Sequence, residues 1–196
     1  GREQLEEALE AFRGEILQIP PMYSALKVKG QKLYELARKG VEVERKPRPV
    51  TIHALEVLEQ TGVDTYLLRV ACSKGTYVRT LCHDIGQALG CGGTMFSLRR
   101  TMAAGFSLEQ ALPLERVLSH SEPHSLLLPV DTYFQDRPPL TLPPALEKKV
   151  RNGMAFPLPG TAEGEYRVYG EDGGFLALSQ VRQGVLTTVK SFYEVT

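Results

Sequence analysis

Cysteine is scarce in this chain, neither sign of charge is in excess, and long apolar runs are absent. The three cysteines, Cys72, Cys82 and Cys91, are too far apart in the sequence for the close pairs of a zinc site. An odd number of cysteines also does not fit a disulfide framework, so we expect free thiols. Lysine plus arginine number 23, as do aspartate plus glutamate, which excludes a chain that is basic throughout. No apolar run approaches the roughly 18 residues that span a bilayer, and no signal-peptide pattern is present. We therefore expect a cytoplasmic protein without membrane contact, in which any binding of nucleic acid depends on local charge.

Apolar residues recur at helical spacing near the N-terminus. Leu5, Leu9, Phe12 and Ile16 follow one another at steps of three or four residues, with glutamates between them. This periodicity predicts an amphipathic helix over residues 2–16. Because neither a strand nor a turn precedes the helix, we expect the chain to be part of something longer.

The segment 20–48 differs from its surroundings in charge. Eight lysines and arginines stand against three glutamates, a local excess of five (eight minus three), and tyrosines are interleaved with them. Such a mixture can bind phosphates and stack on bases, although composition alone equally fits a solvated loop and short helix. We expect a mobile flap that orders on RNA. Its positive residues are Lys27, Lys29, Lys32, Arg38, Lys39, Arg45, Lys46 and Arg48, and its tyrosines are Tyr23 and Tyr34.

The next part of the chain predicts alternating strands and a helix. Residues 49–59 and 65–72 alternate in polarity and are rich in β-branched residues, which indicates an antiparallel pair. Residues 76–89 have a helical apolar face and end at Gly90, a common position for a helix stop. A further short strand is expected over 94–100.

The last third reads as a linker followed by a small β domain. A stretch rich in proline and serine begins near residue 113 and predicts a domain boundary. Beyond it we expect a short helix over 145–151 and then strands separated by glycine turns, which together are long enough only for a compact barrel. The expected strands cover 166–169, 175–181 and 185–193.

The most informative segment runs from Cys72 to Leu81. Here a strand ends at a Lys74-Gly75 turn and leads into a helix whose N-terminal amides attract anions. Tyr77 and Arg79 lie in the first helical turn, where a ring and a guanidinium can face one ligand. On the residues alone, the interpretation to be favoured is that Tyr77 is a core residue and Arg79 a surface charge.

Several strings in the chain resemble the B-type tRNA pseudouridine synthases. The string Ser73–Leu81, with Asp84–Gly86 and Leu89–Gly92 after it, matches one motif region of that family. Gln18–Lys27 and Leu98–Thr101 match two others, in the family's order. The similarity is strong over residues 4–112, and the remainder resembles the family's C-terminal PUA domain more weakly.

The resemblance implies an α+β fold with a mainly antiparallel sheet and helices, which would be part of a pseudouridine synthase catalytic domain, followed by a small PUA-like β barrel. The expected ranges are 1–112 for the catalytic part, with its flap at 20–48, then 113–137 for the linker and 138–196 for the PUA-like RNA-binding domain.

The resemblance also implies a reaction, a partner and a set of site residues. Members of this family isomerise a uridine in the T loop of tRNA, at position 55, to pseudouridine, without a metal or an organic cofactor. Tyr77 would lie against the flipped-out uracil, Leu98 would pack the other side of its pocket, and Arg79 would pair with a nucleophilic aspartate. The T stem-loop would bind to Tyr23, Lys27, Lys29, Lys32, Arg38 and Lys74.

One element of the family pattern is missing from these 196 residues. The nucleophilic aspartate stands in a Gly-x-Leu-Asp-Pro setting, and the chain's five aspartates, Asp64, Asp84, Asp131, Asp136 and Asp172, all lie elsewhere. We expect a fragment that binds RNA and is inactive alone, with a non-catalytic RNA-binding module as the alternative. An incomplete sheet would also leave an exposed edge, through which copies of the chain can associate.

Two further expectations concern single residues. Arg79 cannot lose its proton, so without its carboxylate it must reach water, an anion, a backbone carbonyl or another carboxylate, in a cleft shared with Tyr77 and Leu98. His83-Asp84 is also the metal-binding pair of some phosphohydrolases, which is a rival interpretation. His53, His120 and His124 have no ligand-like spacing that would complete such a site.

Overall fold

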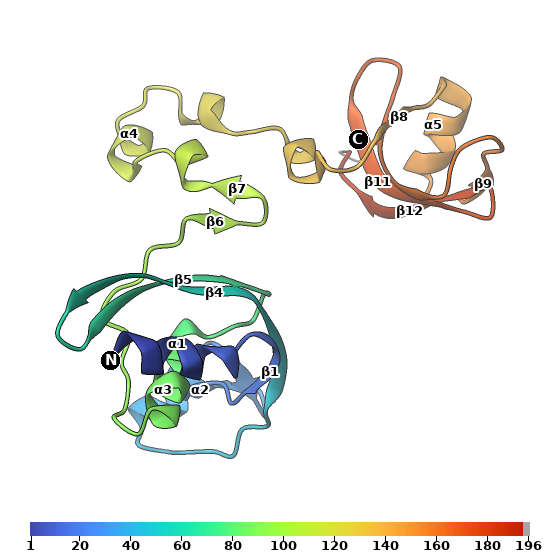
Figure 1. Cartoon of the computed structure of the whole chain (residues 1–196). Helices are drawn as coiled ribbons and strands as arrows, with labels where there is room; N and C mark the ends of the chain where they lie inside the picture. The colour runs from blue at the N-terminus through green and yellow to red at the C-terminus, as the bar shows by residue number, and fades with distance from the viewer. Residues whose placement is uncertain (194–196) are drawn as a thin grey trace. The chain divides into compact units, whose positions relative to one another are not determined.

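The computed structural model describes residues 1–193, which form two compact units, one spanning residues 1–99 and one beginning at Arg100 (Figure 1). None of the helices in the described residues is long and apolar enough to cross a membrane. The expected limits at residues 112 and 138 were drawn from linker composition, and they stay predictions.

A three-stranded antiparallel sheet organises the first unit. Its order is β1 (Gly14–Gln18), β4 (Arg48–Gly62) and β5 (Thr65–Cys72), so that β4 is central. The β4–β5 pair confirms the hairpin expected from the alternating pattern, and register shifts interrupt it at three places. The outer edges of β1 and β5 pair with no other strand in the part of the chain that the structure describes. Self-association through such an edge stays a prediction.

Helices α1 (Arg2–Glu10) and α3 (Val78–Ala88) lie together on one side of this sheet (Figure 1). Apolar positions spaced at three and four residues turn one face of each helix toward the strands, and burial of that face stabilises the unit. The core that results contains Leu5, Leu9, Ile52, Leu55, Leu81 and Ile85.

The expectation of a helix reaching residue 16 is wrong. The helix ends at Glu10, and Gly14, with a φ of 79°, begins β1 instead. Phe12 and Ile16 nevertheless pack against the same core as the helix. The helical spacing of apolar residues continues past the end of α1 because α1 and β1 pack against the same core. Only the part of the pattern up to Glu10 is helical.

The strand expected over 94–100 is also wrong, since the structure assigns no strand to these residues. Their residues have the propensity for extended backbone, but a strand also needs a neighbour for its hydrogen bonds. The preceding Gly92 and Gly93 lie directly against α3. A Cβ built on Gly86 would lie 2.1 Å from Gly92 C and from Gly93 N.

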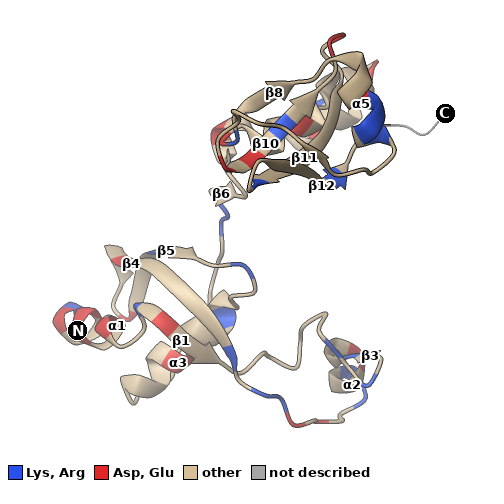
Figure 2. Cartoon of the chain, turned by 90° about the vertical axis from the view of Figure 1, so that its right-hand side faces the viewer, with Lys and Arg blue, Asp and Glu red and all other residues tan. Residues whose placement is uncertain are grey.

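The segment 20–48 contains short elements of its own. A two-residue turn joins β2 (Lys27–Val28) to β3 (Gln31–Lys32) in a short hairpin, and α2 (Leu33–Arg38) follows directly. Leu33 is fully buried, which gives the segment one apolar anchor. Figure 2 shows lysines and arginines along this segment near α2 and β3. We keep the name flap for residues 20–48, and its mobility stays a prediction.

A curled five-stranded sheet forms the C-terminal part of the second unit, in the order β8-β10-β11-β12-β9. All its pairs are antiparallel except β10 with β8. The expected α+β class, with a small barrel-like β domain after a mainly antiparallel first part, is confirmed. The strands are β8 (Pro139–Thr141), β9 (Phe156–Pro157), β10 (Gly164–Tyr169), β11 (Phe175–Arg182) and β12 (Val185–Ser191), and α5 (Pro144–Arg151) packs against them.

The part expected as a linker carries short structured pieces. They are α4 (Leu114–Leu118), η2 (Pro123–Leu126) and η3 (Val130–Phe134). Just before them, in the range expected as catalytic, lie β6 (Met102–Ala103), β7 (Phe106–Ser107) and η1 (Leu108–Gln110).

The last of these pieces, η3, is fastened to the β domain. The Phe134 ring lies 5.5 Å from that of Phe192 and 6.2 Å from that of Phe175. The Tyr169 hydroxyl donates a 2.6 Å hydrogen bond to Asp131. Burial raises the pKa of Tyr169, and this hydrogen bond raises it further.

The close approach of α3 to Gly92–Gly93 generates a stability prediction. Gly86→Ala places a methyl group inside the van der Waals radius of backbone atoms, so the chain after α3 must shift. We expect a loss of about 1–3 kcal/mol in the free energy of unfolding, the usual range for overpacking. Urea denaturation measures it. Gln87→Ala, at an exposed position of the same helix, is the matched control, and equal stabilities of the two variants would contradict this packing.

Candidate functional site

The loop between β5 and α3 is fixed to the central strand at its first residue. Ser73 N donates to Thr51 O over 2.8 Å, and the Ser73 hydroxyl accepts a 2.9 Å bond from Thr51 N. The Thr76 hydroxyl then donates to Ser73 O over 2.9 Å, while Gly75 takes a φ of 86° that favours glycine. The Lys-Gly turn expected from the sequence is therefore a tight, anchored loop.

Tyr77 is the N-cap residue of α3, and its backbone is paired with a buried side chain. Gln18, at the end of β1, is 1% exposed. The Tyr77 N–H donates to Gln18 Oε1 over 2.9 Å, and Gln18 Nε2 donates to Tyr77 O over 3.3 Å. The ring of Tyr77 lies at a half-buried position.

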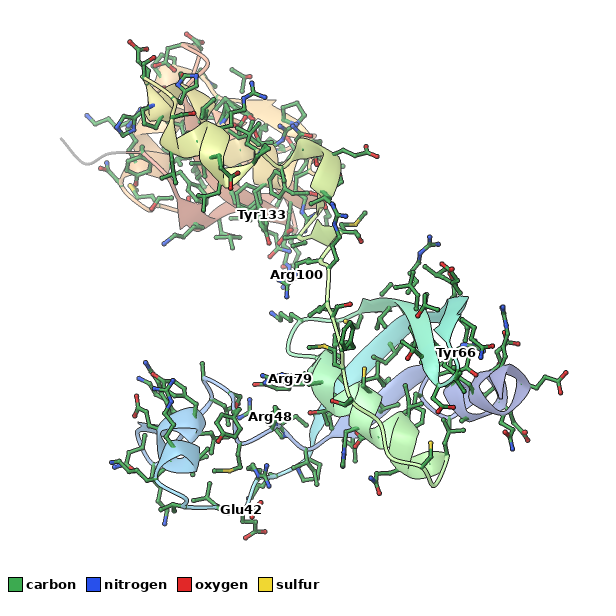
Figure 3. All side chains as sticks on the ribbon, turned by 90° about the vertical axis from the view of Figure 1, so that its left-hand side faces the viewer. Glu42, Arg48, Tyr66, Arg79, Arg100 and Tyr133 are labelled. Carbon is green, nitrogen blue, oxygen red and sulfur yellow. The ribbon has the colours of Figure 1, made fainter. Side chains whose placement is uncertain are left out.

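Arg79, two residues on, connects α3 to the flap. Its Nη2 donates a 2.9 Å hydrogen bond to Tyr23 O, and its side chain is exposed (Figure 3). This confirms the expectation that Arg79 reaches a substitute partner, here a backbone carbonyl. An exposed guanidinium on a carbonyl is free to exchange that partner for an anion, because a charge-assisted bond is the stronger of the two.

A pocket of about 430 Å³ lies between the beginning of the flap and α3. Ile19, Met22 and Tyr23 give it an apolar and aromatic side, and two arginines and a histidine give it positive or protonatable groups. Burial raises the pKa of Asp84, and the nearby His83 opposes the shift. Such a lining suits a planar base that carries an anionic backbone. The full lining is Ile19, Pro21, Met22, Tyr23, Arg45, Arg79, Thr80, His83 and Asp84.

Two of the three expected catalytic residues are not among those that line this pocket. Tyr77 lies at the start of α3, and Leu98 is 59% exposed within the segment 94–100, which belongs to no helix or strand. The structure therefore brings Arg79 together with Tyr23. A common site for Arg79, Tyr77 and Leu98 stays a prediction.

The pocket contains residues that the sequence did not single out for it. Arg45 donates to Pro20 O over 3.3 Å and pairs with Glu42 at 2.9 Å, so it joins the two ends of the flap. His83 stands four residues after Arg79 on α3, so the two share one helical face. The four-residue spacing of Arg79 and His83 was the sequence signal that could have placed His83 at this pocket. No such signal existed for Arg45, because its position depends on how the flap folds back.

The flap's positive charge gathers around one ring. The Lys32 ammonium lies 5.5 Å and the Arg38 guanidinium 5.4 Å from the centroid of Tyr34, both within cation–π range. Lys27 and Lys29 are exposed. Lys74 is exposed too, but it lies in the loop before α3 and not in the flap.

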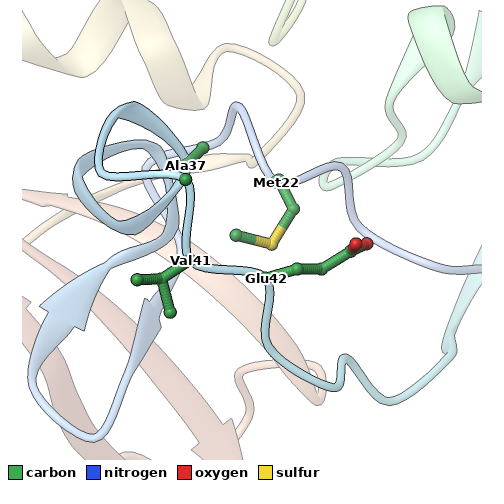
Figure 4. Close-up of a pocket in the computed structure, with 5 residues that line it drawn as sticks. Met22, Ala37, Val41 and Glu42 are labelled. Carbon is green, nitrogen blue, oxygen red and sulfur yellow. The ribbon is translucent and has the colours of Figure 1, made fainter.

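A smaller pocket of about 240 Å³ lies within the flap, where Met22 reaches toward Ala37 and Val41 (Figure 4). Glu42, which pairs with Arg45, also lines it. Met22 lines both pockets, so the two hollows share one flexible side chain.

Ligands for a metal ion do not gather in residues 1–193, where no three histidine, cysteine, aspartate or glutamate side chains could hold one ion. His83 and Asp84, the pair behind the phosphohydrolase interpretation, instead line the pocket beside Arg79.

Solved structures with the same fold cover nearly the whole chain. The crystal structure of a Cbf5-Nop10-Gar1 complex matches with a TM-score of 0.71 and 23% identity, covering 98% of this chain and 62% of that one. The structure of an H/ACA RNP bound to a substrate RNA containing 2′-deoxyuridine matches with a TM-score of 0.69 and 20% identity, covering 99% and 62%. At these identities the likeness shows the fold.

Sequence relatives are much closer. The tRNA pseudouridine synthase B of Alkaliphilus oremlandii is 48% identical over 151 residues, which are 77% of this chain and 50% of the relative. That of Francisella philomiragia is 42% identical over 192 residues, 97% of this chain and 63% of the relative. The chain thus spans between half and about three-fifths of the relatives' length.

Two family models match consecutive parts of the chain. The model of the TruB family pseudouridylate synthase N-terminal domain matches residues 1–78, and that of the tRNA pseudouridylate synthase B C-terminal domain matches residues 79–135. Together they account for more than half of the sequence, in the order expected from its motifs. The chain therefore belongs to the TruB family of pseudouridylate synthases.

Proposed function

We propose that the protein to which this chain belongs isomerises uridine in the T loop of tRNA, at position 55, to pseudouridine. The observation that carries the proposal is the 2.9 Å hydrogen bond from Arg79 to Tyr23 O, which joins the basic flap to the family's motif helix. An RNA strand held by the flap is thereby delivered to the same guanidinium that the resemblance assigns to the nucleophile. We propose that the protein carries out this reaction in the cytoplasm.

The reaction is an isomerisation, in which the bond between the sugar and a ring nitrogen breaks and a bond to a ring carbon forms. The base must leave its stack to be reached, so the site has to replace stacking with contacts of its own. Tyr77 and Leu98 are proposed to supply them on the two sides of the uracil. Arg79 is proposed to hold the nucleophilic carboxylate, for which it would release the Tyr23 carbonyl.

Binding of the T stem-loop is assigned to the flap and the loop before α3. The lysines act as point charges on phosphates, and displaced counterions make the affinity depend on salt. Tyr23, in the pocket, and the cation-flanked Tyr34 offer rings for stacking. The range 138–196 is proposed as a PUA-like domain that adds RNA contact. The residues assigned to RNA are Tyr23, Lys27, Lys29, Lys32, Arg38 and Lys74.

We predict that the 196-residue chain by itself forms no pseudouridine. Its groups can position a uracil, but none of its aspartates stands in the Gly-x-Leu-Asp-Pro setting of the nucleophile, and positioning does not replace a covalent route. Mass spectrometry of a T stem-loop RNA after incubation with the chain measures this. Turnover by the chain alone would contradict the assignment of the site, and an RNA-binding module would show salt-dependent affinity without turnover in any longer form.

A second prediction concerns the flap lysines. Replacing Lys27, Lys29 and Lys32 together by alanine should weaken binding of the same RNA and flatten its dependence on salt. For three lost phosphate contacts on a single strand, the slope of log K against log salt falls by about 2. Fluorescence anisotropy at several salt concentrations measures both quantities.

The matched control removes charge from the same unit away from the flap. Arg2→Ala with Arg69→Ala eliminates two exposed positive side chains, each of which pairs with a glutamate. The slope should stay unchanged in this double variant. If both variants lose affinity alike, net charge and not the flap governs binding.

A further inference from the structure

We propose that Gln18 is a positioning residue for Tyr77, holding the backbone from which the Tyr77 ring projects toward the uracil. This inference rests on the proposed function, because Tyr77 matters here only if it contacts the base. Gln18 and Tyr77 are 59 residues apart in the sequence and meet through two hydrogen bonds.

The contact uses both ends of the Gln18 amide. Oε1 accepts from Tyr77 N at 2.9 Å, and Nε2 donates to Tyr77 O at 3.3 Å. The side chain is 1% exposed, so water cannot take over either bond without a change in packing. A buried amide with a donor and an acceptor directed at one residue imitates the pairing of a neighbouring β-strand.

This pairing occurs where the sheet itself has ended. Gln18 is the last residue of β1, whose backbone there is in register with Arg48 of β4, while β5 ends at Cys72. Tyr77 lies past the end of β5, just before α3 begins. Beyond the last strand-to-strand pair, the Gln18 side chain therefore supplies the hydrogen bonds that hold Tyr77 where the chain enters the helix.

Fixing the backbone of a residue fixes the direction of its side chain. With its N–H and C=O both held, Tyr77 keeps φ and ψ near −100° and 102°, and these angles set the Cα–Cβ direction of the ring. Ser73 holds the other end of the loop through Thr51. The loop is thus held at two points, and the Gln18 contact acts on the residue that carries the ring. The Tyr77 carbonyl also accepts from Leu81 N at 3.0 Å, as the first helical bond of α3, so the bond to the Tyr77 N–H is the one that Gln18 alone supplies among the contacts of the described residues.

The chemistry of glutamine is specific for this task. Asparagine is one methylene shorter and would not span the same distance, methionine has the length but neither polar atom, and glutamate keeps the acceptor while losing the donor. Gln18→Met is therefore the variant that removes the contact at nearly constant volume.

A double-mutant cycle on RNA affinity tests the inference with the 196-residue chain. The probe is a fluorescein-labelled T stem-loop RNA. Tyr77→Ala should weaken binding about tenfold, the scale of one lost stacking contact. Gln18→Met should weaken it by a similar factor in the unmodified chain, and by less than about twofold when Tyr77 is already alanine, because Gln18 would then have no ring to orient.

A purely structural role gives a different result. Leu55→Val lowers stability through the core cluster of the first unit, which includes neither Gln18 nor Tyr77, so any loss of affinity it causes should be equal in both backgrounds. If the Gln18→Met loss is likewise equal in both, the inference is overturned. If the unmodified chain shows no salt-dependent binding of this RNA, the proposed function fails instead, and the two failures are distinct.

Amide hydrogen exchange tests the geometry even where Gln18→Met does not fold. In the unmodified chain the Tyr77 amide should exchange slowly, like the amides of the β4–β5 ladder, because Oε1 of Gln18 accepts from it. Fast exchange at Tyr77 beside a protected ladder would overturn the inference. Where the variant folds, protection at Tyr77 should fall while protection of the ladder is retained.

Discussion

The register of the central strand β4 is the constraint on which the site depends. On one side β4 aligns β1, which ends at Gln18, and on the other it aligns β5, which leads to the loop before α3. Thr51 continues the second ladder by bonding to Ser73. A slip of one residue on either side would exchange the buried and exposed faces of a strand and separate Gln18 from Tyr77. The burial of Ile52 and Leu55 against α1 and α3 opposes such a slip, so the packing of the core and the geometry of the site are one problem.

The charge of individual segments, and not the net charge of the chain, determines how this chain meets RNA. Acidic residues predominate on α1, with four glutamates against one arginine, whereas the flap is basic, and residues outside both segments bring the net charge of the chain to zero. Screening confines the field of exposed charges to about 10 Å at roughly 0.1 M salt, so an RNA phosphate near the flap experiences the flap's lysines and not the sum for the chain. The cation-flanked ring of Tyr34 shows how this density is tolerated, since the negative face of the ring offsets part of the repulsion between Lys32 and Arg38.

What the sequence could predict was local. The helix α3 and the β4–β5 hairpin follow from periodicity within each segment, and motif strings identified the family before any contact was known. The end of α1 was misplaced because Ile16 of β1 serves the same core as the helix, and a strand was expected over 94–100 although pairing depends on a neighbour. The Gln18–Tyr77 contact and the place of Arg45 join positions far apart in the chain. Spacing within one segment carries no information about such meetings.

The attachment of η3 affects where the β domain can be cut from the chain. Proline and serine content suggests a division near residue 138, but Asp131 and Phe134 lie before it and contact Tyr169, Phe175 and Phe192. A recombinant piece beginning at 138 would leave the Tyr169 hydroxyl without its acceptor and two phenylalanine rings more exposed, which favours aggregation. A piece beginning at Pro129 would keep the whole attachment. For this unit, the boundary suited to expression therefore precedes the boundary suggested by composition.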